Sequence, residues 1–95
     1  MPTLHIEHSI TDFDTWKAAF VRFADARREA GVRAHRVQRP VGDQRYVVID
    51  LDFATIDQAQ SFLRFLTSQV WRDPENAPAL AGTPQTKVLE PAEIE

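Results

Sequence analysis

Alternation of apolar and polar residues near the start of the chain predicts a β-strand over residues 3–8. Leu4 and Ile6 fall on one face of this strand, and His5 and Glu7 fall on the other. The second face is polar, but a polar face can still be covered by another surface. We therefore expect the apolar face to pack in a core and leave open what covers the polar one.

The clearest strand pattern lies in the middle of the chain, at residues 45–53. Its apolar face would carry Val47, Ile49, Leu51 and Phe53. Its opposite face would carry Tyr46, Val48, Asp50 and Asp52. Weaker strand patterns occupy residues 31–39 and 85–90, and the glycine-containing segment 40–44 predicts a turn between two strands.

Two further segments, residues 12–30 and 55–71, repeat apolar side chains with the period of an α-helix. The apolar stripe of the first segment consists of Trp16, Ala19, Phe20, Phe23, Ala24 and Ala30. The stripe of the second consists of Ile56, Ala59, Phe62, Leu63, Leu66 and Val70. Each stripe is wide enough to pack against the apolar face of a sheet.

Both predicted helices begin at signals for N-terminal capping. Thr11 with Asp14, and Thr55 with Gln58, have the spacing of a capping box, in which two side chains bind free amides of the first helical turn. Residues 74–84 contain three prolines and one glycine, so they are expected to form a loop.

The resulting order, β-α-β-β-α-β, predicts an α+β fold of the ferredoxin-like, split βαβ type. Its four-stranded antiparallel sheet would carry two helices on one face, in a single domain over residues 1–95 with a core of 1–90 and a tail of 91–95. The helices leave the face that carries Tyr46 and Val48 uncovered. We expect that face to meet a second copy, sheet to sheet, in a homodimer.

Composition narrows the function classes. The net charge of −3 argues against a nucleic-acid partner, and the lack of any long apolar run argues against a membrane-spanning segment. There is no cysteine and the N-terminus lacks signal-peptide features, so a cytoplasmic protein without disulfides is expected. Residues 22–45 hold seven arginines against three acidic residues, which is typical of a solvated helix face or of a surface that attracts an anion.

A polar cluster is expected on the uncovered sheet face. His5 and Glu7 would neighbour Tyr46 and Asp50, because the first and third strands of this fold are adjacent. A histidine beside a carboxylate can act as a general base toward a phenol or a carbon acid. The same groups can instead form a network that joins two subunits. Adding His35 to His5 and Glu7 would give a two-histidine, one-carboxylate metal set, but no metal-site spacing is present and we expect no metal.

Residues 8–20 (HSITDFDTWKAAF) resemble the opening of small dimeric α/β-barrel proteins in the superfamily that includes the antibiotic biosynthesis monooxygenases. The resemblance continues at Gly31-Val32, at residues 47–53 and at Ala81-Gly82-Thr83-Pro84. It implies a homodimer whose two sheets close into a barrel, with a small-molecule cleft between the sheet and the helices of each protomer. Members of similar fold oxidise polyketide phenols without a cofactor, degrade haem or isomerise lactones, and others have no known activity.

The resemblance transfers few site residues. Haem-degrading members use an asparagine in the first strand and an iron-ligating histidine; this chain has no asparagine there and no histidine after His35, so haem degradation is not expected. Phenol-oxidising members surround the substrate with tryptophan, tyrosine, arginine and asparagine, and similar types here are Trp71, Tyr46, Arg72 and Asn76. His8 would lie at the corner between the first strand and helix, where it either hydrogen-bonds the loop or faces the cleft.

Two hypotheses follow. The first is an enzyme, a cofactor-independent monooxygenase or a cyclase-like enzyme acting on an aromatic or polyketide-like substrate. Its base would be His5 or His8, and its substrate-binding residues would be Glu7, Tyr46, Asp50, Trp71 and Arg72. The second is a non-catalytic dimeric module that binds a ligand or serves assembly. Trp16 would pack in the core, whereas Trp71 would wall the pocket or pack beneath the proline-rich loop.

Overall fold

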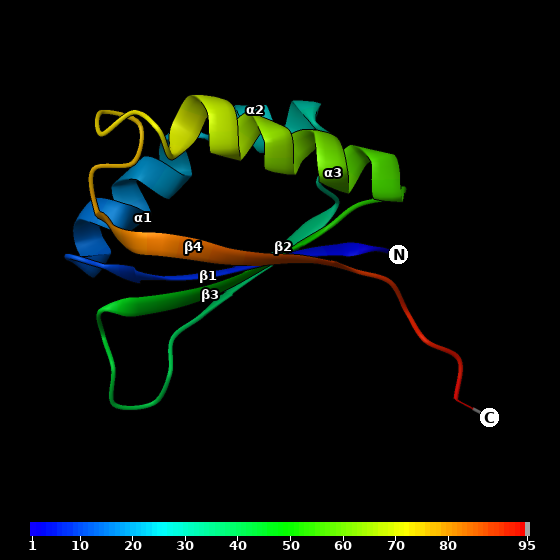
Figure 1. The fold of residues 1–95 in the computed structure, drawn as a ribbon, viewed down its shortest axis with the longest axis horizontal. Helices are drawn as coiled ribbons and strands as arrows, with labels where there is room; N and C mark the ends of the chain where they lie inside the picture. Colours follow the sequence, from blue (N-terminus) through cyan, green and yellow to red (C-terminus); the bar gives the residue numbers. More distant parts are fainter. Residues whose placement is uncertain (95) are drawn as a thin grey trace.

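The computed structural model describes residues 1–94 and shows strands and helices in the predicted order. The elements are β1 (Thr3–Ile10), α1 (Phe13–Arg22), α2 (Ala24–Glu29), β2 (Ala34–Gln38), β3 (Tyr46–Asp52), α3 (Ile56–Phe65), the π-helical turn η1 (Leu66–Val70) and β4 (Leu80–Leu89). Within residues 1–94 the strands form an antiparallel sheet in the order β2-β3-β1-β4, and the helices lie on one of its faces (Figure 1). The ferredoxin-like split βαβ fold is thereby confirmed.

The core lies between the sheet and the helices and is built on the alternation of β1 and β3. Leu4 pairs with Leu51 and Ile6 pairs with Ile49 across the two strands. Every second residue of each strand points to the helices and is buried. The buried apolar cluster comprises Leu4, Ile6, Ile10, Trp16, Val47, Ile49, Leu51, Phe53, Ala59, Phe62 and Ala79. Burial of apolar surface on this scale is the main stabilising term of such a domain.

The helix predicted over residues 12–30 is broken at Phe23 into α1 and α2. The carbonyl of Phe20 accepts a hydrogen bond from the amide of Phe23 at 3.2 Å and another from Nη1 of Arg27 at 2.6 Å. The predicted cap is also wrong in its residue. Asp12, not Thr11, is the N-cap of α1, and its carboxylate accepts from the amide of Thr15 at 2.8 Å.

The predicted loop over residues 74–84 ends earlier than expected, because β4 begins at Leu80. Glu7 pairs with Gln85 while Ser9 pairs with Ala81, so β4 carries extra residues between these two pairs. This bulge contains Gly82, whose φ of 73° lies in the left-handed region. β4 is an edge strand, where glycine and proline are tolerated. These loop-type residues therefore mark a bulge within a strand.

The second helix begins as predicted, with a capping box formed by Thr55 and Gln58. Its last part is not α-helical, because residues 66–70 form the π-helical turn η1. Residues 90–94 have no regular structure and extend away from the sheet (Figure 1). Glu95, the end of the predicted tail, lies outside the described residues. None of the helices within residues 1–94 has the length and apolar character required to span a lipid bilayer.

Candidate functional site

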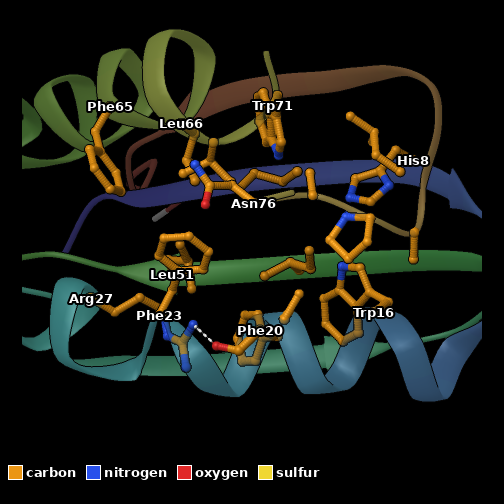
Figure 2. Close-up of a pocket in the computed structure, with 18 of the residues that line it drawn as sticks. His8, Trp16, Phe20, Phe23, Arg27, Leu51, Phe65, Leu66, Trp71 and Asn76 are labelled. Atoms are coloured by element: carbon orange, nitrogen blue, oxygen red, sulfur yellow. Dashed lines mark hydrogen bonds between the residues drawn. The ribbon is translucent and has the colours of Figure 1, made fainter. Parts of the chain in front are cut away.

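A pocket of about 80 Å³ lies between the sheet and the helices (Figure 2). Its walls are mostly apolar. The aromatic side chains in the walls come from α1, α3 and the segments that follow them, and they are Trp16, Phe20, Phe23, Phe62, Phe65 and Trp71. Polar groups are few, and they come from His8, Arg27 and Asn76. We call this space the inner pocket.

His8 is the polar residue that β1 contributes to the inner pocket. It occupies the buried face of the strand, in line with Leu4 and Ile6, and its side chain is almost fully buried. It lies at the register irregularity between Glu7 and Ser9, where the pairing with β4 is interrupted. Bulges are frequent beside active sites because they re-aim side chains.

The protonation of His8 follows from its surroundings. Its Nδ1 lies 2.9 Å from the carbonyl oxygen of Ser9, and since a carbonyl can only accept, Nδ1 carries the hydrogen. Burial lowers the pKa of the imidazole, and the bond to Ser9 opposes this effect only in part. The ring is therefore neutral with its lone pair on Nε2. Within residues 1–94, Nε2 has no hydrogen-bonding partner, and it keeps some accessible surface.

Trp71 reaches the inner pocket because of η1. The amide of Trp71 donates to the carbonyl of Leu66 at 2.8 Å, a bond that spans five residues as in a π-helix. This wider turn aligns Leu66 and Trp71 on the same side, and both line the pocket together with Val70. The indole of Trp71 meets the imidazole of His8 edge to face, with ring centroids 6.5 Å apart.

Trp16 forms the opposite wall and belongs to the core, as the sequence predicts. It is 9% exposed and stacks on Phe20, with ring centroids 4.9 Å apart. Phe13 lies 5.7 Å from it on the other side. Trp16 therefore both fills the core and lines the pocket.

Arg27 is the pocket residue that the sequence analysis did not select. It follows Trp16, Phe20 and Phe23 at helical spacing, so it occupies an apolar-stripe position. An arginine within an apolar stripe is the sequence signal for this position, whereas its membership in the basic segment 22–45 indicates only a charged surface. In the structure Arg27 is 8% exposed, and burial lowers its pKa.

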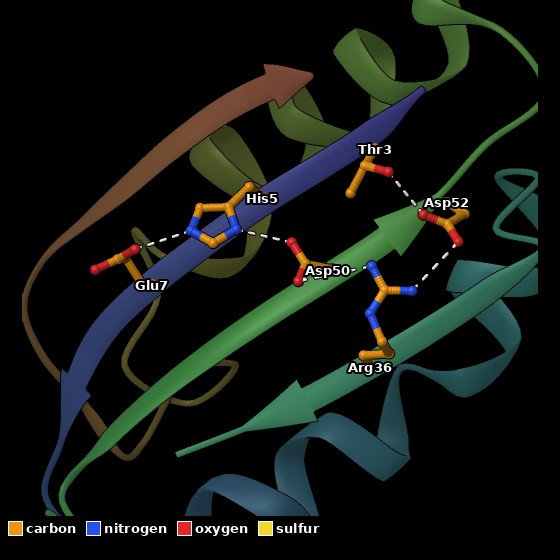
Figure 3. A network of polar contacts seen from close by, with 6 residues as sticks. All are labelled: Thr3, His5, Glu7, Arg36, Asp50 and Asp52. Carbon is orange, nitrogen blue, oxygen red and sulfur yellow. Dashed lines mark hydrogen bonds and ion pairs between the residues drawn. The ribbon is translucent and has the colours of Figure 1, made fainter. Parts of the chain in front are cut away.

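The opposite face of the sheet carries a polar network around His5 (Figure 3). Nδ1 of His5 lies 2.7 Å from Asp50, and Nε2 lies 2.8 Å from Glu7. Because carboxylates accept, both ring nitrogens donate and His5 is an imidazolium. Hydrogen bonds to Glu7 and then to Asp50 raise its pKa. We call these residues, with Thr3, Arg36, Tyr46 and Asp52, the sheet-face network.

The remaining contacts extend this network across three strands. The hydroxyl of Tyr46 donates to Glu7 at 2.6 Å, which lowers the pKa of Glu7 and raises that of Tyr46. Arg36 on β2 lies 3.7 Å from Asp50 and 3.6 Å from Asp52. Three acidic groups thus face two cations, so charge within the network is nearly balanced.

The sequence-selected residues therefore fall into two separate places. His5, Glu7, Tyr46 and Asp50 meet on the open face of the sheet, as their strand positions predict. His8 and Trp71 meet in the inner pocket, on the other side of the sheet. Arg72 is exposed and does not line the inner pocket.

His35 is remote from His5 and Glu7. It pairs with Leu51 across β2 and β3, so it shares the helix-side face of the sheet, and its ring contacts Phe20 at 5.5 Å. Within residues 1–94 no three His, Cys, Asp or Glu side chains are placed to hold a metal ion.

Comparison with solved structures identifies the fold. A protein from Deinococcus radiodurans, provisionally described as an antibiotic biosynthesis monooxygenase, matches with a TM-score of 0.73 at 14% identity, over 100% of this chain and 96% of that chain. An uncharacterised NIPSNAP domain protein from Burkholderia xenovorans matches with a TM-score of 0.64 at 16% identity, over 97% of this chain and 95% of that chain. A dimeric ferredoxin-like protein from an uncultured marine organism matches with a TM-score of 0.62 at 11% identity, over 97% of this chain and 96% of that chain.

These neighbours agree with the superfamily that the sequence resemblance indicates, and at this identity they establish the fold alone. No protein-family model matches the chain. No curated protein matches it either.

Proposed function

We propose that the protein binds a small aromatic molecule in the inner pocket and that His8 acts as its general base. The observation that carries this proposal is the fixed tautomer of His8. The Ser9 carbonyl holds the hydrogen on Nδ1, which leaves the Nε2 lone pair without a partner among residues 1–94, in a mainly aromatic pocket. A base aimed into an apolar pocket is a common arrangement for proton transfer.

The pocket walls favour an aromatic substrate. Rings of Trp16, Phe20 and Trp71 can pack against a planar ligand by stacking and edge contacts. A phenol in this space would donate its O–H to Nε2 of His8. The O–H bond then breaks with its electron pair left on oxygen, and a new N–H bond forms at Nε2. The resulting phenolate is the reactive species for cofactor-free reaction with dioxygen, the oxidant, or for a cyclase-like rearrangement.

Low pKa and base strength oppose one another at His8. Burial favours the neutral ring, so the base is ready at neutral pH, but the same burial disfavours the imidazolium that forms. The phenolate formed beside it offsets this cost, because opposite charges attract strongly where water is excluded. Activity should therefore fall in acid only below the ordinary histidine value of about 6.5.

Ligand entry requires the pocket to widen. Its volume of about 80 Å³ is well below the roughly 300–1,000 Å³ of most ligand sites. The segment from η1 to Leu80 is the part best placed to move. It packs on the pocket through Trp71. Hydrogen bonds join its connecting loop to the rest of the chain at two points, from Arg22 to the Glu75 carbonyl and from the Thr11 amide to the Ala79 carbonyl, each at 2.9 Å. We propose that displacement of Trp71 opens the pocket.

The test is phenol binding followed by tryptophan fluorescence and by calorimetry. His8→Phe keeps a planar ring but removes the acceptor, so it should weaken phenol binding about fivefold, the effect of losing one hydrogen bond worth about 1 kcal/mol. Toluene, which has no hydroxyl, should bind both proteins alike. His35→Phe, on β2 and outside the pocket lining, is the matched control. Equal phenol affinity in His8→Phe and wild type would contradict the proposed role.

A second candidate function, assembly, rests on the sheet-face network. Each of its charged groups has a partner of opposite charge and its hydrogen bonds are formed within one chain, so this face can meet another surface without leaving a charged group unpaired. His5 has no lone pair free to accept a proton, which favours a role in the network over one as base. We propose that two copies pack through this face as a homodimer, which the description of one neighbour as dimeric supports.

A further inference from the structure

Arg27 lines the inner pocket, and the described part of the chain gives it no acidic partner. It is 8% exposed, and it forms no ion pair with any acidic group in residues 1–94. Arginine is rarely buried to this degree unless its charge is paired. The absence of a carboxylate beside it is therefore the feature that needs an explanation.

Contacts within the chain satisfy only part of the guanidinium. Nη1 donates to the Phe20 carbonyl at 2.6 Å, and the guanidinium carbon lies 3.6 Å from the centroid of the Phe20 ring. This bond and the cation–π contact hold the side chain in place. Nε and Nη2 have no hydrogen-bonding partner within the described part of the chain, yet both keep accessible surface. Their donors remain available to a ligand.

The charge of the pocket selects the kind of ligand. Arg27 and His8 are the titratable side chains of the lining, and His8 is neutral. A single positive charge balances a single negative charge. A carboxylate carries one charge and matches the planar fork of a guanidinium, whereas a phosphate carries nearly two and would be left uncompensated.

The positions of Arg27 and His8 add a geometric requirement. They lie at opposite ends of the pocket, with the aromatic side chains between them (Figure 2). A ligand that reaches both must therefore carry its anionic group and its acidic proton at opposite ends of an apolar body.

We propose that Arg27 binds a carboxylate of the substrate, which makes the substrate an aromatic acid with a phenol, or a similarly acidic proton, at its far end. This inference rests on the proposed function, since it assigns the second end of the same site. Arg27 then selects the substrate, and His8 takes the proton.

The experiment compares 4-hydroxybenzoate with 4-hydroxybenzamide, its uncharged amide of similar shape, and with phenol. Affinities are measured by calorimetry in wild type and in Arg27→Met, which keeps a long apolar stem and removes the charge. Arg28→Met is the matched control, because Arg28 is the next residue of α2 but is exposed and pairs with Asp25. Arg27→Lys tests whether a charge without the planar fork is sufficient.

Wild type and Arg28→Met should bind the acid at least tenfold more tightly than the amide, and Arg27→Met should bind both alike. Arg27→Lys should keep a reduced preference. Equal binding of acid and amide by wild type would overturn the inference without any variant, even if Arg27→Met fails to fold. If phenol binds but the acid is not preferred over the amide, only the proposed role of Arg27 is contradicted. If none of the three compounds binds, the proposed function itself is contradicted.

Discussion

The imidazole of His8 and the indole of Trp71 meet edge to face across the inner pocket, with ring centroids 6.5 Å apart and planes at 69°. They come from elements far apart along the chain, β1 and the turn after η1, and both line the pocket. In our proposal one ring is the base and the other is the movable wall. The two roles can be separated by mutation.

The two tryptophans of the pocket should respond differently to truncation. Trp16→Ala removes a buried ring stacked on Phe20 and should cost about 3–5 kcal/mol of unfolding free energy. Trp71 is half-buried, so Trp71→Ala should leave the protein folded and weaken phenol binding instead. Urea denaturation and calorimetry of both variants measure this. Unfolding by Trp71→Ala and not by Trp16→Ala would show that the roles are reversed.

Protonation of His5 should stabilise the fold in mild acid. Its pKa is raised in the folded state, so the stabilisation is complete below the unfolded value of about 6.5 and is lost as pH rises through the folded pKa. His5→Gln should therefore reduce stability most near pH 5–6, with a loss that shrinks at higher pH. Denaturant titrations over this range, with His35→Gln as control, provide the measurement. A loss that grows with pH would contradict the imidazolium assignment.

The sheet-face network should be required for dimerisation. Arg36 lies between Asp50 and Asp52, so Arg36→Glu places a third carboxylate beside two others. If this face is the interface, the variant should be monomeric where wild type is dimeric. Arg28→Glu, on the helix side, should stay dimeric. Sedimentation velocity at micromolar concentration measures the oligomeric state of all three proteins. A monomeric wild type would contradict the proposed homodimer.

The capping box at the start of α3 should contribute measurably to stability. The hydroxyl oxygen of Thr55 caps α3 by accepting from the amide of Gln58 at 3.1 Å, while Oε1 of Gln58 accepts from the amide of Thr55 at 3.3 Å. Thr55→Ala should cost about 1 kcal/mol. Thr11→Ala should cost less, because Asp12 caps α1 in place of the Thr11 that the sequence predicts. Thermal denaturation of both variants measures the difference.

Much of the fold could be predicted because strand parity and helical spacing record which side chains face the core. Leu4, Ile6, Ile49 and Leu51 alternate with polar residues, and this placed the His5 cluster on one face. Parity also separates His5 from His8. What the pattern could not show was the bulge around Gly82, because the same residues mark loops and bulges.

The pocket was harder to predict than the sheet. The break at Phe23 coincides with the hydrogen bond from the Arg27 side chain to the Phe20 carbonyl, and the π-helical turn carries the Trp71 amide to the Leu66 carbonyl. Helical spacing and intrinsic propensity predict neither feature, because both depend on individual hydrogen bonds. An arginine in an apolar stripe was visible in the sequence, but its meaning required the pocket around it.

The most direct measurement is a long-range ¹H–¹⁵N NMR spectrum of the histidine rings, recorded with and without phenol. We predict that His8 is neutral with its hydrogen on Nδ1, and that phenol shifts its Nε2 resonance while leaving those of His5 in place. His8 carrying the hydrogen on Nε2, or phenol shifting His5 while His8 stays unchanged, would contradict the assignment of the inner pocket as the functional site.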